Sequence, residues 1–235
     1  AALYGSRAGN GVVLITTRSG SGVKQGLGVS FSTTNTFDVP YNFVSVQNKF
    51  GSGNDGAHRL QQEENPSWGP QLDVGEKWVQ WNSDGEEVPL ISYPDRFKDF
   101  FNTGFSTTNN LAVDGNYKKG YFRLSVGDLR NTGVIPNTDL NRSSINLNLG
   151  YKLTANFTIT TNFNWSESGS GNRPNIDGDD RNAVVRSLYE WGPEVNVMDL
   201  KDYWVKGQEG IQQLKYKEKQ NNPWFLAHEN TQSFK

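Results

Sequence analysis

The sequence predicts an all-β protein, a partial transmembrane antiparallel β-barrel of about six strands whose long loops carry short helices. Three observations predict this class. Several segments of about ten residues alternate apolar and polar side chains, as strands with one apolar face do. Short turns and long loops join these segments in alternation. The hydrophobic fraction is 34%, low for a globular domain with a large core, while glycine is abundant at 25 residues.

The composition argues against several other classes of protein. The chain contains no cysteine, which excludes disulfides, zinc–thiolate sites and a cysteine nucleophile. The formal net charge of −2 gives no electrostatic reason to expect a nucleic-acid partner. No run of about 18 apolar residues is present, so no membrane-spanning helix is expected.

The first residues are expected to be the end of a folded unit that begins before them. Glycine-rich turns precede the β-branched run Val12–Thr17, which predicts a buried strand. Apolar and polar side chains then alternate from Leu27 to Phe37, a length sufficient for a tilted strand to cross a bilayer. Pro40 ends this pattern.

The segment Val39–Gly104 is long and irregular in sequence. It contains one expected helix, Tyr93–Phe101, with Ser92 as its N-cap, Pro94 in its first turn and Gly104 as its stop. A stretch of this length without regular structure is unusual in a compact domain, so we expect it to be functional or to pack on another part of the protein.

Four further strands with the same alternation are predicted, at Phe105–Asp114, Tyr121–Leu129, Ser143–Leu153 and Phe157–Ser166. Tyr117–Gly120 and Thr154–Asn156 are short turns, whereas Asn131–Asn141 is a longer loop. By connectivity the short turns share one end of the sheet and the long loops share the other. This asymmetry is typical of bacterial outer-membrane barrels.

Aromatic side chains cluster near both ends of these strands. Two such girdles are typical of a barrel anchored at two membrane interfaces. A soluble β-sandwich is the alternative, because its inward face also alternates. The girdle residues are Tyr121, Tyr151 and Phe157 near the short turns, and Phe37, Phe105 and Trp165 near the long loops.

A second long excursion runs from Ser168 to Pro223. We expect a helix over Arg181–Trp191, where apolar residues pair four positions apart, and another helical turn within Asp199–Lys206. The segment Trp224–Phe234 is expected to begin a returning strand.

Several short motifs along the chain resemble motifs of a single protein family. They are Tyr4–Arg18, Asn65–Pro70 with Leu72-Asp73, Phe97–Gly104, Thr108–Asn110, Gly133–Asp139 and Asn222–Trp224. Together they cover essentially the whole chain in the expected order. The chain on this basis resembles the SusC/RagA-type TonB-dependent outer-membrane importers of the Bacteroidetes, and Tyr4–Arg18 resembles the end of their plug domain.

This resemblance implies a 22-stranded barrel with an N-terminal plug. Residues 1–22 would be the C-terminal end of the plug, and residues 23–235 would be the N-terminal strands and loops of the barrel. The family implies energy-coupled import of an oligosaccharide or peptide across the bacterial outer membrane. A SusD-like surface lipoprotein would cap the barrel, and the TonB complex would act on plug residues upstream of Ala1.

Two alternatives to this function stay open at the level of sequence. A TonB-dependent receptor for a siderophore or cobalamin would show selectivity for a metal chelate or corrin and would lack a capping partner. A soluble carbohydrate-binding β-sandwich would have no lipid-facing band and would stay in solution without detergent.

No catalytic constellation is visible, so no enzyme activity and no cofactor are predicted. His58 and His228 are far apart in the sequence. Asn175–Asp179 places oxygen ligands at the alternate positions of a calcium loop but lacks the glycine and the final acid that such a loop needs. No metal site is therefore predicted, although calcium at Asp177 and Asp179 is left open.

Two sets of residues are candidates for contact with a ligand or partner. Aromatic side chains of the long loops could stack on sugar rings or meet the capping partner, with packing inside their own loops as the alternative: Trp68, Trp78, Trp81, Trp191, Tyr203 and Trp204. Polar side chains of the strands are expected to face the lumen as a neutral hydrogen-bonding wall: Asn146, Asn148, Asn162 and Asn164.

Overall fold

A computed structural model describes residues 20–22, 25–58, 67–176, 183–229 and 231–234. They form mostly β-sheet with a few short helices. The predicted strand Val12–Thr17 lies outside the described residues, so the domain boundary after residue 22 stays a prediction. None of the helices in these ranges is long and apolar enough to cross a membrane.

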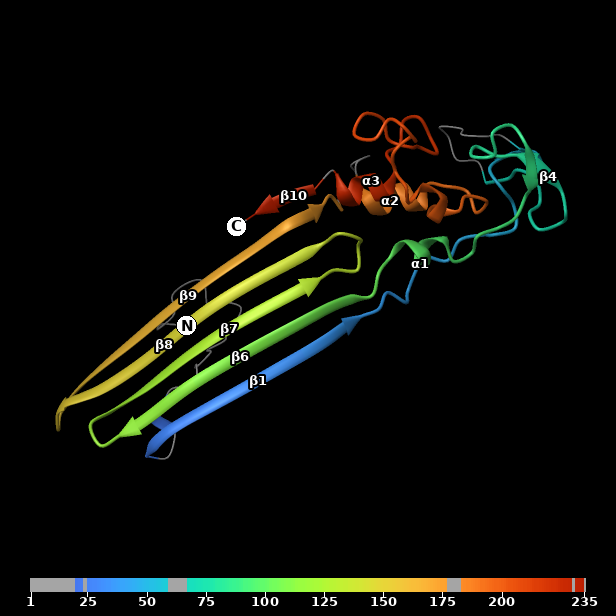
Figure 1. Cartoon of the computed structure of the whole chain (residues 1–235). Coiled ribbons are helices and arrows are strands. Elements are labelled where there is room, and N and C mark those ends of the chain that lie inside the picture. Colours follow the sequence, from blue (N-terminus) through green and yellow to red (C-terminus); the bar gives the residue numbers. More distant parts are fainter. Residues whose placement is uncertain (1–19, 23–24, 59–66, 177–182, 230, 235) are drawn as a thin grey trace, which may run out of the picture. The chain divides into compact units, whose positions relative to one another are not determined.

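The all-β prediction is confirmed by a 6-stranded sheet in the order β1-β6-β7-β8-β9-β10 (Figure 1). Among the described residues this sheet is open, with β1 and β10 at its edges. The predicted strands are present, and β9 runs on to Pro174, beyond the predicted end at Ser166. The added residues include no large apolar side chain, so the alternation that predicts a strand is missing there. The bounds are β1 Gly26–Asp38, β6 Gly104–Tyr117, β7 Gly120–Thr132, β8 Asp139–Thr154, β9 Phe157–Pro174 and β10 Thr231–Phe234.

The long strands pair in a regular antiparallel register. For each pair of strands joined by two contacts, the two contacts agree on a single register. Residues that lie opposite one another on one face therefore form rows that run across the sheet. The contacts that define it join Gly28 to Asp114 and Phe37 to Phe105 (β1–β6), Ser106 to Asn131 (β6–β7), Asp128 to Ser143 and Lys119 to Lys152 (β7–β8), and Asn148 to Asn162 and Arg142 to Ser168 (β8–β9).

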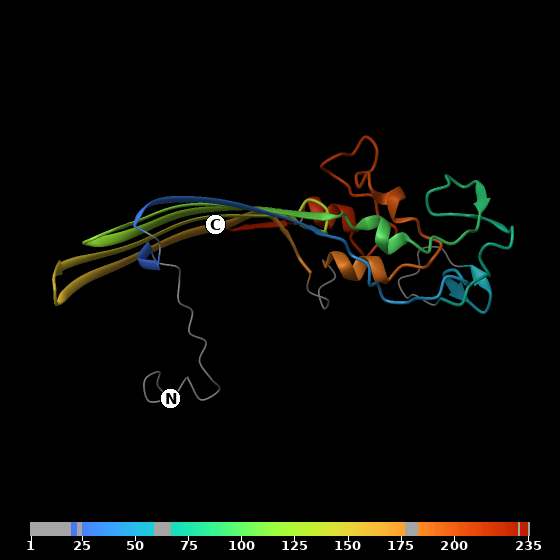
Figure 2. The same ribbon diagram turned by 90° about the horizontal axis from the view of Figure 1, so that it is seen from below.

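The chain divides by its internal contacts into two compact units. Unit 1 comprises Ala1–Ser32, Asn110–Gly127 and Ser144–Ser166, and unit 2 comprises Thr33–Asn109, Asp128–Ser143 and Glu167–Lys235. The described strands of unit 1 form a single layer, which Figure 2 shows edge-on. Unit 2 contains the remaining parts of the strands and all of the long loops.

Unit 2 has a hydrophobic core of its own, in the two long loop segments 39–103 and 175–229, which we call the loop cluster. Phe97 of α1 packs against Tyr189 of α2 with ring centroids 4.4 Å apart, and Phe100 packs against Trp224 of α3 at 4.8 Å. The two excursions from the sheet therefore stabilise each other. The helices are α1 Arg96–Phe100, α2 Val184–Tyr189, α3 Pro223–His228 and the 3-10 helix η3 Val197–Leu200.

Two small hairpins lie within the segment that the sequence predicts to be irregular. The first turns at Asp55-Gly56, where φ is 52° and 77°, and the second at Asp84-Gly85, where φ is 50° and 86°. Asp and Gly tolerate this left-handed conformation best, so these pairs were an available sequence signal. The hairpins pair β2 Gly53–Asn54 with β3 Ala57–His58, and β4 Lys77–Val79 with β5 Glu87–Pro89.

The predicted ends of α1 were wrong. The N-cap is Asp95, not Ser92, and Ser92 instead donates its hydroxyl to the Asp73 carboxylate at 2.6 Å. The helix ends at Phe100, and Gly104 begins β6. Ser92 and Asp73 are 19 positions apart, so local capping rules could not detect this competing partner.

The helical turn expected within Asp199–Lys206 lies earlier, at η3, because the Asn196 side chain accepts a hydrogen bond from Met198 N and caps it. The strand expected over Trp224–Phe234 was also wrong in its first half, which is helix α3. Asn222 caps this helix and a proline occupies its first turn, two start signals that the sequence already carried. Only Thr231–Phe234 forms a strand, β10, which pairs antiparallel with β9.

Asn222→Ala is expected to destabilise the loop cluster. The Asn222 side chain is fully buried, and its Oδ1 accepts from Trp224 N at 2.8 Å. Its Nδ2 donates to Leu200 O at 2.8 Å and to Leu214 O at 3.0 Å. Removing the cap and both donors should cost about 2–4 kcal/mol. Limited proteolysis of the full-length protein should therefore cut this variant faster within the loop cluster.

The exposed Asn42→Ala is the matched control and should be cut at the wild-type rate. Asn222→Asp keeps the capping oxygen but sets a carboxylate oxygen against the Leu200 and Leu214 carbonyls in a buried site, so this variant should be cut at least as fast as Asn222→Ala. Equal cutting of wild type and Asn222→Ala would contradict the structural role assigned to this side chain.

Candidate functional site

One face of the strands in unit 1 exposes large apolar side chains. Each of these residues has a total surface on the order of 150–200 Å² and exposes roughly half of it to solvent. Together they form an apolar patch on the order of 1,000 Å². Soluble monomers rarely expose a contiguous apolar patch of more than a few hundred Å². The exposed residues are Leu27, Val29, Phe31, Leu111, Tyr117, Leu124, Val126, Ile145, Leu149, Tyr151, Leu153, Phe157, Ile159, Phe163 and Trp165.

The opposite face of unit 1 is polar, and it carries the asparagines singled out in the sequence. Asn146, Asn148, Asn162 and Asn164 line one concavity of about 290 Å³ together with Arg123. Asn148 donates from its amide to Asn162 Oδ1, which links β8 to β9. Asn148 Oδ1 itself is buried without a hydrogen-bond partner among the described residues. The concavity is thus lined by carboxamide groups.

An ion pair neutralises the charge beside this concavity. Arg123 Nη1 lies 2.7 Å from Asp114 Oδ1, and Asp114 is 6% exposed. The close approach of β1 depends on Gly28, where a Cβ atom would stand 2.7 Å from Asp114 Oδ2. The polar face therefore combines carboxamides with a mutually compensated charge pair, a surface suited to uncharged polar molecules.

One member of the predicted aromatic girdle lies on the wrong face. A Cβ atom at Gly150 would meet the Tyr121 ring at 2.3 Å, so Tyr121 packs over Gly150 on the polar face. Tyr151 and Phe157 do belong to the exposed apolar face. The prediction failed for Tyr121 because it considered depth along the strand and ignored the alternation of faces.

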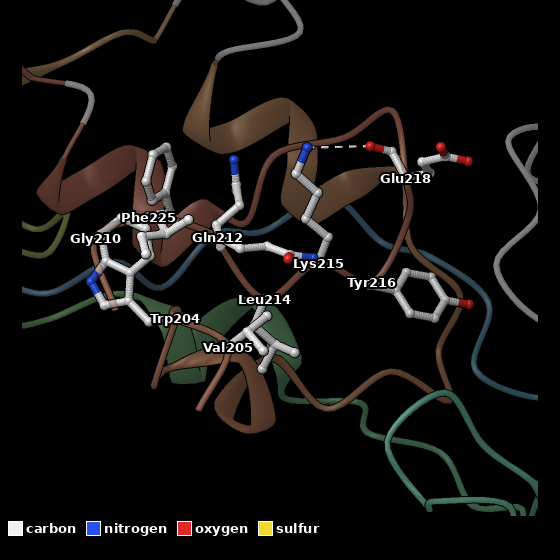
Figure 3. Close-up of a pocket in the computed structure, with 11 residues that line it drawn as sticks. Trp204, Val205, Gly210, Gln212, Leu214, Lys215, Tyr216, Glu218 and Phe225 are labelled. Atoms are coloured by element: carbon white, nitrogen blue, oxygen red, sulfur yellow. Dashed lines mark hydrogen bonds between the residues drawn. The ribbon is translucent and has the colours of Figure 1, made fainter. Parts of the chain in front are cut away.

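The loop cluster contains a second concavity, of about 780 Å³ (Figure 3). Trp204 and Phe225 line it with their rings packed edge to face, 5.4 Å between centroids. Gln212 and Lys215 add polar groups, and Lys215 Nζ donates to the Glu218 carbonyl at 3.3 Å. Aromatic surface beside amide and ammonium groups suits a ligand with both apolar faces and hydroxyl or carbonyl groups.

Tyr203 lies behind this concavity and is half-buried. Its ring packs against Trp204 at 5.5 Å and stacks on His228 at 5.4 Å. Its hydroxyl donates to Glu229 Oε1 at 2.9 Å, and burial together with this carboxylate raises the pKa of Tyr203. Tyr203 therefore positions Trp204 from behind.

Two other aromatic candidates are built into the core of the loop cluster. Trp191 is 5% exposed, donates its indole N–H to Gln220 and packs edge-on against Tyr216. Trp81 packs against the same Tyr216 ring, with centroids 6.0 Å apart. Trp191 consequently has no open ring face to offer, which contradicts its prediction as a contact residue.

The last two aromatic candidates lie apart from the 780 Å³ concavity. Trp68 is 66% exposed and packs on Phe50 at 5.8 Å. Trp78 is half-buried in β4, with its indole N–H donated to Glu76 at 3.1 Å. Of the predicted aromatic residues, Trp204 is the one that lines this concavity and Trp68 is the most exposed.

A buried polar group joins the two segments of the loop cluster, and sequence reasoning missed it. Glu194 Oε1 accepts from Ser52 N at 3.2 Å and from the Tyr216 hydroxyl at 3.4 Å. Burial, with the nearby Glu194 carboxylate, raises the pKa of Tyr216. Burial lowers the pKa of Arg96, and the Glu194 carboxylate offsets part of this lowering. Arg96 Nη1 donates a hydrogen bond to Asn48 Oδ1 at 2.9 Å.

No group of three or more His, Cys, Asp or Glu side chains within the described ranges is placed to hold a metal ion. The calcium positions Asp177 and Asp179 lie outside the described residues. His228 Nδ1 contacts the Trp224 carbonyl at 2.8 Å, a bond within helix α3.

The chain is similar to curated TonB-dependent receptors. It is 26% identical over 209 residues to TonB-dependent receptor P39 of Formosa agariphila. This match covers 88% of this chain and 18% of that protein. It is 27% identical over 150 residues to TonB-dependent receptor SusC of Bacteroides thetaiotaomicron, 63% of this chain and 13% of that protein. TonB-dependent receptor P3 of Formosa agariphila is 24% identical, over 97% of this chain and 20% of that protein.

The chain thus spans a fifth or less of the length of these curated relatives. No family model matches it. The similarity covers most of this chain and includes SusC by name, which confirms the predicted resemblance to SusC-type TonB-dependent receptors.

Tyr216→Phe is expected to change how the stability of the loop cluster depends on pH. Because the folded state raises the pKa of Tyr216, its contribution is constant below the ordinary tyrosine range near pH 10 and declines above it. The variant keeps the ring but has no proton to lose. Hydrogen exchange of the loop cluster in both proteins, measured from neutral to strongly alkaline pH, should show wild type losing stability relative to the variant. Parallel curves would contradict the assignment.

Proposed function

Since the chain is similar over most of its length to SusC-type TonB-dependent receptors, we propose that it contributes barrel strands to a TonB-dependent importer of the bacterial outer membrane. The proposed cargo is a large nutrient, an oligosaccharide or a peptide. The protein acts as a transporter and catalyses no chemical step. Its plug would be displaced by the TonB complex, and a SusD-like lipoprotein would close its outer side, as the resemblance implies.

The observation that carries this proposal is the sidedness of the sheet in unit 1. Its apolar face is exposed in Phe31, Val126 and Ile145 alike, while the other face carries carboxamides and an ion pair. A water-soluble sandwich would bury its apolar face against a second sheet. A barrel strand turns that face to lipid and the polar face to an aqueous lumen.

The polar concavity is proposed to face the lumen. Asn146, Asn148, Asn162 and Asn164 present amide donors and acceptors, and the Arg123–Asp114 pair leaves no net charge beside them. Such a wall can exchange hydrogen bonds with a passing polar molecule without holding it through a strong charge contact. This favours uncharged oligosaccharides or peptide backbones over ionic cargo.

The loop cluster is proposed to contact the ligand or the capping lipoprotein. Trp204 presents an aromatic surface at the 780 Å³ concavity, and Tyr203 positions it from behind. Trp68 offers a second exposed aromatic side chain and Trp78 a half-buried one. The buried Trp191 ring belongs to the core of the loop cluster, and the partly buried Trp81 ring packs against that core.

The function is tested by deleting the gene of the full-length protein and growing cells on a panel of glycans and peptides as sole nutrients. We expect growth to fail on one polymer but to continue on its monomers, and a tonB deletion to give the same defect. A defect limited to iron or cobalamin supply would favour the siderophore or cobalamin receptor. Growth that is unaffected, or a defect independent of TonB, would refute the proposal.

Trp204→Ala is expected to weaken uptake of the nutrient found in this screen about two- to twelvefold, because one aromatic contact is worth roughly 0.5–1.5 kcal/mol beyond buried area. Trp204→Phe should keep most of the uptake. Tyr41→Ala, which removes a side chain that is 90% exposed, is the matched control and should behave as wild type. Uptake is measured with labelled nutrient at equal surface levels of protein. Wild-type uptake by Trp204→Ala would remove Trp204 from the site.

A further inference from the structure

The exposed apolar face is interrupted by polar residues along the long strands, and Phe37 and Phe105 return large apolar side chains to it on β1 and β6 beyond the interruption. By the register described above, five residues form one row across β1, β6, β7, β8 and β9, and all are apolar: Phe31, Leu111, Val126, Ile145 and Trp165. The row on their short-turn side is apolar as well: Val29, Val113, Leu124, Leu147 and Phe163.

The next residues on the same face, two positions further along each strand, are all polar. They are Thr33, Asn109, Asp128, Ser143 and Glu167, followed by Asn35, Thr107, Arg130, Asn141 and Gly169. Neither of these two rows contains a large apolar side chain. The change from apolar to polar therefore occurs at one level of the register on all five strands.

The side chains of the two polar rows are charged or can form hydrogen bonds, so they are more stable in water than in hydrocarbon. Asp128 accepts from Ser143 at 3.4 Å and forms an ion pair with Arg130 at 3.1 Å, with both charged side chains substantially exposed. Asn141 and Glu167 line a concavity of about 370 Å³ in unit 2. A charged side chain on the lipid face destabilises a barrel in a depth-dependent way, least near the interface.

We infer that the hydrocarbon of the membrane ends between these two levels, so that acyl chains cover the face up to Phe31, Leu111, Val126, Ile145 and Trp165. Beyond this line the two polar rows meet headgroups and water. This inference rests on the proposed outer-membrane location, which it refines by assigning the line at which lipid contact stops.

The dimensions of the strands agree with this line. From Ile145 to Leu153 the apolar positions of β8 span about 26 Å along the strand, at a rise of roughly 3.3 Å per residue. A tilt of about 40° converts this to about 20 Å along the membrane normal, close to the apolar band of roughly 25 Å in such barrels. On β9 the polar continuation Glu167–Pro174 adds a further length of about 25 Å along the strand.

The line is tested by spin labels on single cysteines in the full-length protein, reconstituted in lipid vesicles from a cysteine-free background. Labels at Leu111, Val126, Ile145 and Trp165 should collide more with lipid-soluble oxygen than with a water-soluble nickel complex. Labels at Asn109, Asp128, Ser143 and Glu167 should show the reverse. Asn146 and Asn164 lie at the depth of the apolar rows on the opposite face, and labels there should also prefer the nickel complex.

The outcomes separate this inference from the proposed function. An oxygen preference that continues through Asn109, Asp128, Ser143 and Glu167 would overturn the line but keep the membrane location. A nickel preference at all positions would overturn both. A substitution pair gives a second readout: Leu149→Arg, in the middle of the band, should reduce the amount of folded, heat-modifiable protein, whereas Ser143→Arg on the same face of the same strand should not.

Discussion

A β-strand places successive side chains on opposite faces, and this period of two is the constraint on which the rest of the structure depends. In a single layer of strands each face has to find its own surroundings. A slip of one residue between neighbouring strands would exchange the two faces and bring carboxamides among the apolar side chains. The register prevents this exchange. At two positions it requires glycine, because a Cβ atom there would clash with a side chain of the neighbouring strand. Gly28 leaves room for Asp114 and Gly150 leaves room for the Tyr121 ring.

The loop cluster meets a different requirement, because long connections have to bury enough apolar surface to be ordered. It does so with a core of its own, in which Phe100, Leu188 and Trp224 come from three separate helices. The buried Glu194 carboxylate, which accepts from Ser52 and Tyr216, joins the two excursions across 142 positions of sequence. Its second oxygen lacks a hydrogen-bond partner among the described residues.

The strands could be predicted from the sequence because their signal is local: Ile145, Leu147 and Leu149 alternate with polar residues in the sequence itself. The short helices could be predicted only in part. The competing partner of Ser92 lies 19 positions away, whereas the Asn222-Pro223 start of α3 and the Asp55-Gly56 turn are local signals that the sequence carries. The role of each aromatic residue could not be predicted, because burial of Trp191 depends on Tyr216 and Gln220 from a distant part of the chain.

The two kinds of structure in this chain constrain their sequences to different degrees. The exposed face, which we propose to meet acyl chains, would need apolar side chains of no particular shape, because lipid is fluid and fills any gap between them. A packed core such as that around Phe100 and Trp224 needs complementary shapes, since each removed methylene leaves a cavity. Identity of 24–27% with the curated relatives is therefore compatible with a common sheet, while the exposed part of the loop cluster is free to differ. In the proposed importer, differences in cargo would arise at surface positions such as Trp204, which packs on Phe225, a residue that borders the core, without being part of the core.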